Sequence, residues 1–134
     1  MQHFIKVNEF EVRVYVEDVD CMGIVYHPNY LCYLERARTE LLRDNNWILS
    51  DLIKKDILFA IKELTIKYIF PARLDDLLNV VTQITEANVC SFLFEQTVTN
   101  QHEKIICEAK ILVVCVNGNL KPQRLPQFSN ETSE

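Results

Sequence analysis

The fold of this chain is decided by the stretch Val14-Tyr-Val-Glu-Asp-Val-Asp-Cys-Met-Gly-Ile-Val-Tyr-His-Pro-Asn-Tyr30. A carboxylate, Asp20, follows a run of β-branched residues, and a histidine, His27, precedes a segment with helical spacing. Gly23, one of only 2 glycines in the chain, lies between them and indicates a turn. A strand end, an acid, a glycine turn and a helix start bring a carboxylate and backbone N–H groups toward one point. Acyl-transfer chemistry needs that pair of groups.

Regular elements are predicted on both sides of this stretch. Residues 9–16 alternate polar and apolar side chains and predict a half-buried strand. Its inward side chains would be Phe10, Val12, Val14 and Val16. Pro28 suits a first helical position, and residues 29–45 carry apolar side chains at helical spacing. We therefore expect a long helix over 29–45 and a short one over 50–55.

The remainder of the chain is strand-like. Runs rich in β-branched and aromatic residues predict strands over 58–70, 77–86, 91–100 and 104–116. One strand, one long helix and four strands in meander order predict an α+β fold. One helix covers one face of a five-stranded sheet, so its exposed flank and an unpaired edge strand predict an oligomer. We expect a single domain over residues 1–134, with residues 122–134 as a loose polar tail.

Composition excludes several classes of function. A net charge of −5 and the lack of long basic runs argue against a broad nucleic-acid-binding surface. No apolar run approaches the roughly 20 residues of a membrane span, and the first ten residues lack a secretory signal. The 5 cysteines are odd in number and scattered, which predicts reduced thiols in a cytoplasmic protein. No metal site is expected, because no paired Cys or His spacing suits zinc, and no other cofactor is expected.

A set of motifs spread along the chain is similar to those of one family. They are Val12-Arg-Val-Tyr15, Glu17-Asp-Val-Asp20, Gly23-Ile-Val-Tyr-His27, Tyr30, Tyr33-Leu-Glu-Arg-Ala-Arg-Thr-Glu40, Pro71-Ala-Arg-Leu-Asp-Asp76 and Val113-Val-Cys-Val116. Together they resemble the hotdog fold of the 4-hydroxybenzoyl-CoA thioesterase superfamily. The match is closer still to its YbgC-like branch of acyl-CoA thioesterases, which is associated with the Tol–Pal envelope system. The spaced Asp-x-x-Gly-x-x-Tyr-His set is the most specific part.

The resemblance implies a fold, an assembly and an activity. One long helix would be wrapped by a five-stranded antiparallel sheet in the order β-α-β-β-β-β, with sheets joined across a homodimer or a dimer-of-dimers homotetramer. Acyl-CoA would lie at the subunit boundary and be cleaved to free acid and CoA. With Asp20 at the glycine turn, our leading hypothesis is hydrolysis of short- to medium-chain acyl-CoA. Asp20 matches the family's catalytic carboxylate, and His27 matches its histidine at the helix entry. A link to an acyl carrier protein or to the Tol–Pal system would also follow.

The chemistry of such a site can be written from the residues. Asp20 could attack the thioester carbonyl as a nucleophile or activate water as a general base. Backbone N–H groups around His27 to Tyr30 would donate to the oxyanion, although Pro28 has none. Alternatively, Asp20 caps a turn and Asp18 is the reactive acid. His27 could equally be a helix cap or a packed ring.

Other residues in and near the stretch are candidates for binding substrate. Gly23, Val25, Tyr26, Tyr30 and Glu35 form this set. The two tyrosines suit a pocket wall or the core better than chemistry. Glu35 belongs to a helical charge cluster with Arg36, Arg38 and Glu40, whose spacing favours intrahelical pairs. Arg38 could alternatively reach a neighbouring subunit.

Three further interpretations remain beside the leading one. A hotdog dehydratase or hydratase would pair His27 with an acid on the helix, either Glu35 or Glu40. A non-catalytic acyl-carrier-binding or envelope-associated protein would need no catalytic acid. Cys21 as a nucleophile is opposed by the adjacent Asp20, which disfavours a thiolate. The cations Lys62, Lys67 and Arg73 could hold CoA phosphates or could be ordinary solvated charge.

Overall fold

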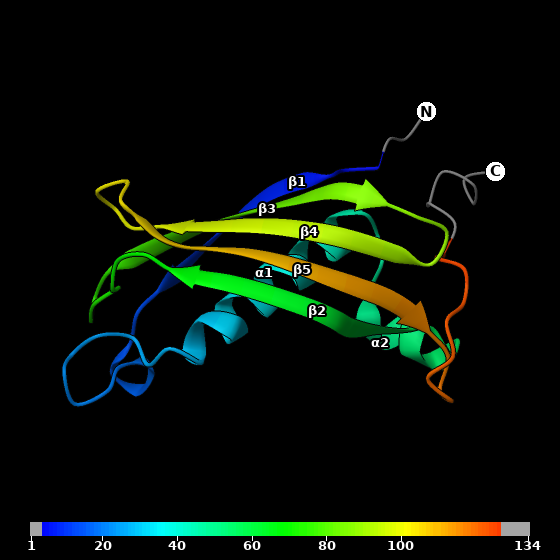
Figure 1. The fold of residues 1–134 in the computed structure, drawn as a ribbon, viewed down its shortest axis with the longest axis horizontal. Helices are drawn as coiled ribbons and strands as arrows, with labels where there is room; N and C mark the ends of the chain where they lie inside the picture. Colours follow the sequence, from blue (N-terminus) through cyan, green and yellow to red (C-terminus); the bar gives the residue numbers. More distant parts are fainter. Residues whose placement is uncertain (1–3, 127–134) are drawn as a thin grey trace.

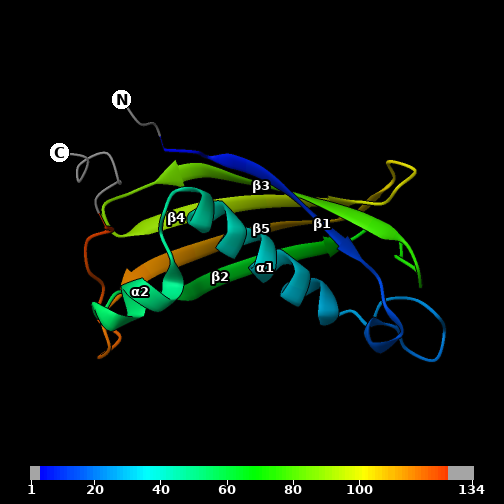
Figure 2. The ribbon, with the colours of Figure 1, turned by 180° about the vertical axis from the view of Figure 1, so that it is seen from behind.

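The structure, a computed structural model, describes residues 4–126. The elements are β1 (Val7–Arg13), η1 (Val16–Asp18, a 3-10 helix), α1 (Asn29–Asp44), α2 (Leu49–Lys54), β2 (Leu58–Tyr68), β3 (Leu77–Ala87), β4 (Ser91–Thr99) and β5 (Ile105–Val116). All strand pairs are antiparallel. The long helix lies across one face of the sheet, as the view from behind shows (Figure 2). The α+β architecture predicted from the sequence is confirmed.

The order of strands differs from the predicted meander. Across the sheet it is β1-β3-β4-β5-β2 (Figure 1). Only β3, β4 and β5 form a meander, because β2 pairs with β5, from Leu58 opposite Val116 to Tyr68 opposite Cys107. Residues 69–76 carry the chain from the β2 edge to β3 across the end of the sheet (Figure 1). This crossover, in which Asp75 has a φ of 74°, connects two strands that are not neighbours in the sheet.

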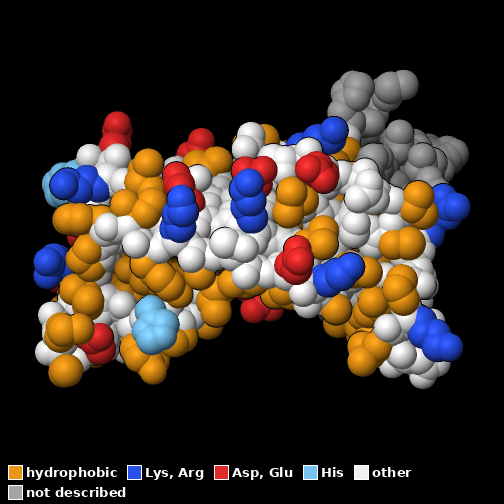
Figure 3. Space-filling model, viewed as in Figure 1, with side chains coloured by type: hydrophobic (Ala, Val, Ile, Leu, Met, Phe, Trp, Pro, Cys, Tyr) orange, Lys and Arg blue, Asp and Glu red, His pale blue; other side chains and the backbone are white. Residues whose placement is uncertain are grey.

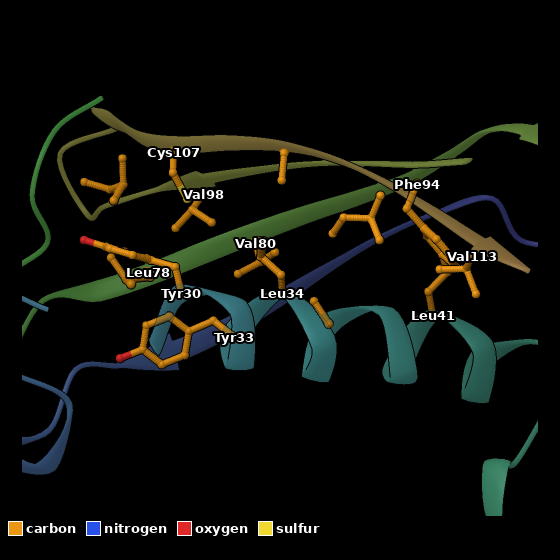
Figure 4. Close-up of a cluster of buried hydrophobic side chains, with 14 of the residues drawn as sticks. Tyr30, Tyr33, Leu34, Leu41, Leu78, Val80, Phe94, Val98, Cys107 and Val113 are labelled. Atoms are coloured by element: carbon orange, nitrogen blue, oxygen red, sulfur yellow. The ribbon is translucent and has the colours of Figure 1, made fainter. Parts of the chain in front are cut away.

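The core lies between α1 and the concave face of the sheet. The helix buries one side through Tyr33, Leu34, Ala37 and Leu41. These side chains face Leu78, Val80, Phe94 and Val98 from the strands (Figure 4). Burying one leucine side chain stabilises the folded state by about 2 kcal/mol. Several apolar side chains lie at helical spacing on one face of α1, so their burial holds this face of the helix against the sheet.

Strand β4 keeps the alternation predicted for it. Phe92, Phe94, Gln96 and Val98 are buried, and the residues between them are only half-buried. Gln96 is the exception to an apolar inner face. Its amide nitrogen donates to the Leu34 carbonyl and the Thr82 hydroxyl, each at 2.9 Å, and its amide oxygen accepts from Arg38 at 3.1 Å. A buried amide with partners on both sides is the arrangement that its desolvation requires.

The first strand ends earlier than predicted. We expected residues 9–16, but β1 stops at Arg13. Val14 is fully buried as expected, whereas Val16 is 73% exposed and begins η1. The cause is Asp18, whose carboxylate accepts the Tyr15 N–H at 2.9 Å while its own N–H donates to the Tyr15 carbonyl. A turn closed in this way takes the chain out of the sheet.

The remaining segments bear on the other predictions. Within the tail expected over 122–134, Gln123 N–H donates to the Cys115 carbonyl and Leu125 N–H to the Val89 carbonyl. Residues 127–134 lie outside the described part. All five cysteines are free thiols. Among the described residues, no helix has both the length and the apolar character needed to cross a membrane.

Candidate active site

The turn that carries Asp20 is a small, tightly bonded loop. Val19 and Val25 form a β-bridge at its base. Asp20 N–H donates to the Ile24 carbonyl, and Gly23 N–H donates to the Asp20 carbonyl, each at 3.0 Å. Gly23 has a φ of 77°, a conformation that side-chain-bearing residues rarely adopt. An added Cβ would meet no atom within 4 Å, so the turn requires glycine for its backbone conformation rather than for space.

This turn is joined to the crossover between β2 and β3. Ile24 forms a β-bridge with Arg73. Val25 N–H donates to the Ala72 carbonyl at 2.9 Å, and Val14 N–H donates to the Asp76 carbonyl at 2.9 Å. The loop therefore takes its position from a distant part of the chain. The sequence alone gave no sign of that contact.

One oxygen of the Asp20 carboxylate accepts a hydrogen bond, and the other has no partner among the described residues. Oδ1 accepts the N–H of Met22 at 2.8 Å, which is the turn-capping role considered as an alternative. The second oxygen, Oδ2, has no hydrogen-bond partner within residues 4–126, and the side chain is half-buried. Capping and reaction are thus compatible, because the cap orients the carboxylate and leaves one oxygen available.

The rival acid, Asp18, has a structural environment. It is only 9% exposed. Oδ2 accepts the Tyr15 N–H and Oδ1 accepts the Asn29 side-chain amide, both at 2.9 Å. Its backbone carbonyl accepts the Tyr26 N–H. With both oxygens in use, Asp18 holds η1 and the start of α1 together rather than facing a substrate.

A tyrosine of the helix lies beside this buried acid. Burial and the neighbouring Asp18 carboxylate both raise the pKa of Tyr33. Its ring packs in the core at the beginning of α1 (Figure 4). The phenol therefore stays protonated, and its place is in the scaffold of the loop rather than in proton transfer.

An apolar groove opens at the helix entrance; the Asp20 turn reaches it through Ile24 and Val25, whereas Asp20 itself is not among the lining residues. Its volume is about 310 Å³. It is lined by Ile24, Val25, His27, Tyr30, Tyr68, Ile69, Phe70 and Pro71. Burial raises the pKa of Tyr30, whose hydroxyl oxygen accepts the Ala72 N–H at 3.0 Å. This bond holds the Tyr30 side chain in the wall of the groove.

His27 lies at the mouth of the groove with its ring exposed. The ring stands edge-on to Tyr26 and Tyr68, with centroids 5.2 and 6.1 Å away. The Tyr68 hydroxyl donates to the His27 carbonyl at 3.2 Å, which ties the end of β2 to the helix entry. Aromatic packing orients the imidazole, but neither ring nitrogen has a hydrogen-bond partner in the described chain.

The amides at the helix entry differ from the expected set of donors. The N–H groups of Asn29, Tyr30 and Leu31 donate to carbonyls three residues earlier, at 2.8, 3.3 and 3.0 Å. Pro28 has no N–H. The His27 N–H alone among residues 27–30 lacks an acceptor in the described chain. It is therefore the amide available to a developing oxyanion.

The structure brings together part of the predicted substrate-binding set. Val25 and Tyr30 line the groove with His27, and Gly23 shapes the adjacent turn. Tyr26 is 52% exposed and supports His27 from outside. Glu35 lines a different groove, of about 130 Å³, between α1 and β2.

Several lining residues were missed at the sequence level. Tyr68 and Ile69–Pro71 come from the end of the strand-like run over 58–70 and the break that follows it. A run of large apolar residues next to a proline was the available signal. It could not be placed, because the position of β2 in the sheet was unknown.

Comparisons with known proteins identify the family. The model of the thioesterase-like superfamily matches residues 14–134. The chain belongs to the thioesterase-like superfamily. It is 42% identical over 117 residues to the acyl-CoA thioester hydrolase YbgC of Escherichia coli O6:H1, covering 87% of each chain. It is also 42% identical over 120 residues to the acyl-CoA thioesterase YbgC of Haemophilus influenzae, covering 88% of each.

A solved structure agrees with this assignment to the thioesterase-like superfamily. A probable thioesterase from Bartonella henselae superposes with a TM-score of 0.80 at 34% identity, covering 91% of this chain and all of that one. The hotdog fold and the membership of a thioesterase family expected from the sequence are thus confirmed. The expectation of an enzyme of the thioesterase class is confirmed with them.

Proposed function

We propose that the chain hydrolyses short- to medium-chain acyl-CoA thioesters, with Asp20 as the catalytic carboxylate. The observation that carries this proposal is the free Oδ2 of Asp20, held by a capped turn beside an apolar groove at the helix entrance. The names of the two YbgC relatives support the substrate class. The groove, at about 310 Å³, suits a short acyl chain.

The residues suggest how the reaction proceeds. Asp20 either attacks the carbonyl carbon, forming an anhydride that water then opens, or removes a proton from the attacking water. The His27 N–H donates to the oxyanion, and one such donor is commonly worth about 3 kcal/mol of transition-state stabilisation. The C–S bond breaks as the anhydride forms or, in the water route, as the tetrahedral intermediate collapses, and the CoA sulfur takes a proton. The acyl group leaves as a free acid once water has added to it. Val25 and Tyr30 hold the acyl chain, and the His27 ring orients the thioester.

The proposal includes a homodimer, or a dimer of dimers, formed through β2. This strand is an edge of the sheet and leaves a row of backbone groups unpaired. Its inner face exposes Ile61, Leu64 and Tyr68 by 51, 38 and 48%. Hydrophobic side chains gather in the hollow below β2 (Figure 3). A contiguous exposed apolar strip on an edge strand indicates an interface.

The proposal extends to the location and the partners of the protein. A cytoplasmic location suits five free thiols, and the link to an acyl carrier protein or to the Tol–Pal system depends on the resemblance alone. The dehydratase alternative gains no support. Glu40 pairs with Arg43 at 3.3 Å, and Glu35 lines a different groove from His27.

The decisive test is release of free thiol from a panel of acyl-CoAs. The wild-type chain should release thiol, and Asp20→Asn should lower kcat by about 100-fold or more, the usual range for losing a general base. Asp51→Asn, an equivalent change on the exposed first turn of α2, is the matched control. Circular dichroism establishes that both variants are folded. Full activity of Asp20→Asn would refute the role of this acid.

A further inference from the structure

In the part of the chain that the structure describes, Arg38 is a buried cation without a carboxylate partner. Its side chain belongs to a residue only 8% exposed, in the middle of α1. Nη1 donates to Gln96 Oε1 at 3.1 Å, and the guanidinium carbon lies 6.0 Å from the centroid of the Phe94 ring. Within residues 4–126, Arg38 forms no ion pair and no second hydrogen bond. Burial lowers the pKa of Arg38, and the Glu35 charge acts in the opposite direction.

A guanidinium carries five donors, so one neutral acceptor leaves most of them unused. A buried charge is costly unless an opposite charge and hydrogen bonds compensate for its desolvation. Arg38 lines the groove of about 130 Å³ between α1 and β2. A carboxylate entering this groove would complete the environment of Arg38.

Glu35 has the complementary property. It lies one turn before Arg38 on α1, lines the same groove and is exposed. Within the described residues it forms no ion pair, unlike Glu40 on the same helix, which pairs with Arg43. One groove therefore presents an unpaired acid and an unpaired base side by side. Such a surface is complementary to itself.

We infer that the groove between α1 and β2 receives Glu35 of a second copy of this chain, whose carboxylate binds Arg38. This inference rests on the proposed dimer and names the contact that aligns its helices. In a twofold interface a contact between two positions occurs twice, so each Arg38 meets the partner's Glu35. The exposed inner face of β2, with Ile61 next to Arg38 in the groove lining, brings the second copy to this place.

Two charge-reversal variants test the contact between chains. Glu35→Lys alone and Arg38→Glu alone place like charges opposite each other, so each should dimerise at least about 10-fold more weakly than the wild type. A mixture of the two restores both ion pairs between chains while leaving like charges within each chain. Native mass spectrometry of the mixture should show more heterodimer than random exchange gives. Random or lower heterodimer content would overturn the inference.

A milder variant keeps the test decisive if Arg38→Glu does not fold. Glu35→Gln should raise the dimer dissociation constant about 10-fold, whereas Glu86→Gln, at an exposed position of β3, should leave it unchanged. An unchanged constant for Glu35→Gln would overturn the inference. A second result would also overturn the inference: Glu35→Gln could leave the dimer intact and change only the hydrolysis of acyl-CoAs that bear a terminal carboxylate. The substrate carboxylate, and not the partner's Glu35, would then be the group that binds Arg38. Hydrolysis by the wild type is measured separately, so failure of the proposed activity is distinguishable.

Discussion

Two aspartates two residues apart have opposite environments. Asp18 is buried with both oxygens bonded, whereas Asp20 is half-buried with one oxygen free. Residue type and spacing cannot separate them, since both follow the same strand and precede the same turn. Only the resemblance favoured Asp20 at the sequence level. The hydrogen bonds supply the physical reason.

Replacing Asp18 should cost stability. Asp18→Ala leaves the Tyr15 N–H and the Asn29 amide without their acceptor, which should lower the free energy of unfolding by about 2 kcal/mol. Chemical denaturation followed by fluorescence measures the change. Glu17→Ala is the control, because Glu17 is an exposed neighbour in the same 3-10 helix. Equal losses in the two variants would contradict the structural role of Asp18.

Cys107 should make stability sensitive to alkaline pH. Burial raises the pKa of this thiol from 9.0 to about 12. The folded state thus holds its proton over a range in which the unfolded chain loses it, so the contribution is complete below pH 9 and falls between pH 9 and 12. The slope should be about 1.4 kcal/mol per pH unit for one such group. Cys107→Ala should decline less steeply than the wild type, and the exposed control Cys21→Ala should match it.

The sequence could not predict that the His27 N–H would be the amide at the helix entry without an acceptor in the described chain. The position of a helix start was predictable from Pro28 and the apolar spacing that follows. Which amides remain free depends on whether the first turn closes with bonds to carbonyls three residues earlier, as it does at Asn29 and Leu31. That choice is set by the packing of the loop and not by residue type.

At the scale of elements, local sequence patterns predicted most boundaries of helices and strands. They did not predict which strands pair in the sheet. Buried side chains alternate along β4 and recur at helical spacing along α1, because each element buries one face. Both patterns can be seen directly in the sequence. The pairing of β2 with β5 joins segments about 50 residues apart, and each strand would suit several neighbours equally. The departure of Val16 from β1 depends on a side chain two residues later.

The junction between α1 and β4 should depend on one amide. Gln96→Leu keeps the size of the side chain but removes the acceptor of Arg38 and the donor to Thr82. An unpaired buried charge should lower the free energy of unfolding by about 3 kcal/mol. Thr97→Val, on the opposite face of β4, should change it by less than about 0.5 kcal/mol. Thermal unfolding of both variants compares them, and similar melting temperatures would contradict the importance of the network.

At the scale of the whole molecule, activity should depend on assembly. Ile61→Lys puts a charge on the exposed inner face of β2, and burying it in an interface would cost several kcal/mol. Sedimentation velocity should then show a monomer, and thioester hydrolysis should fall with the loss of the dimer. Val7→Lys, an exposed position on the opposite edge strand β1, should remain a dimer with wild-type activity. A monomeric Ile61→Lys with full activity would separate catalysis from assembly.

The connection between the Asp20 turn and the crossover constrains how the site can move. Val14 and Val25 each donate backbone hydrogen bonds to residues of the 69–76 segment. The turn therefore opens only when the crossover also releases it, so the two segments act as one cooperative unit. Deuterium exchange should report matching protection for the amides of Val14 and Val25. For the proposed hydrolysis, this coupling would give the substrate an entrance of fixed shape, so that acyl chains would be selected by fit rather than by closure of a lid.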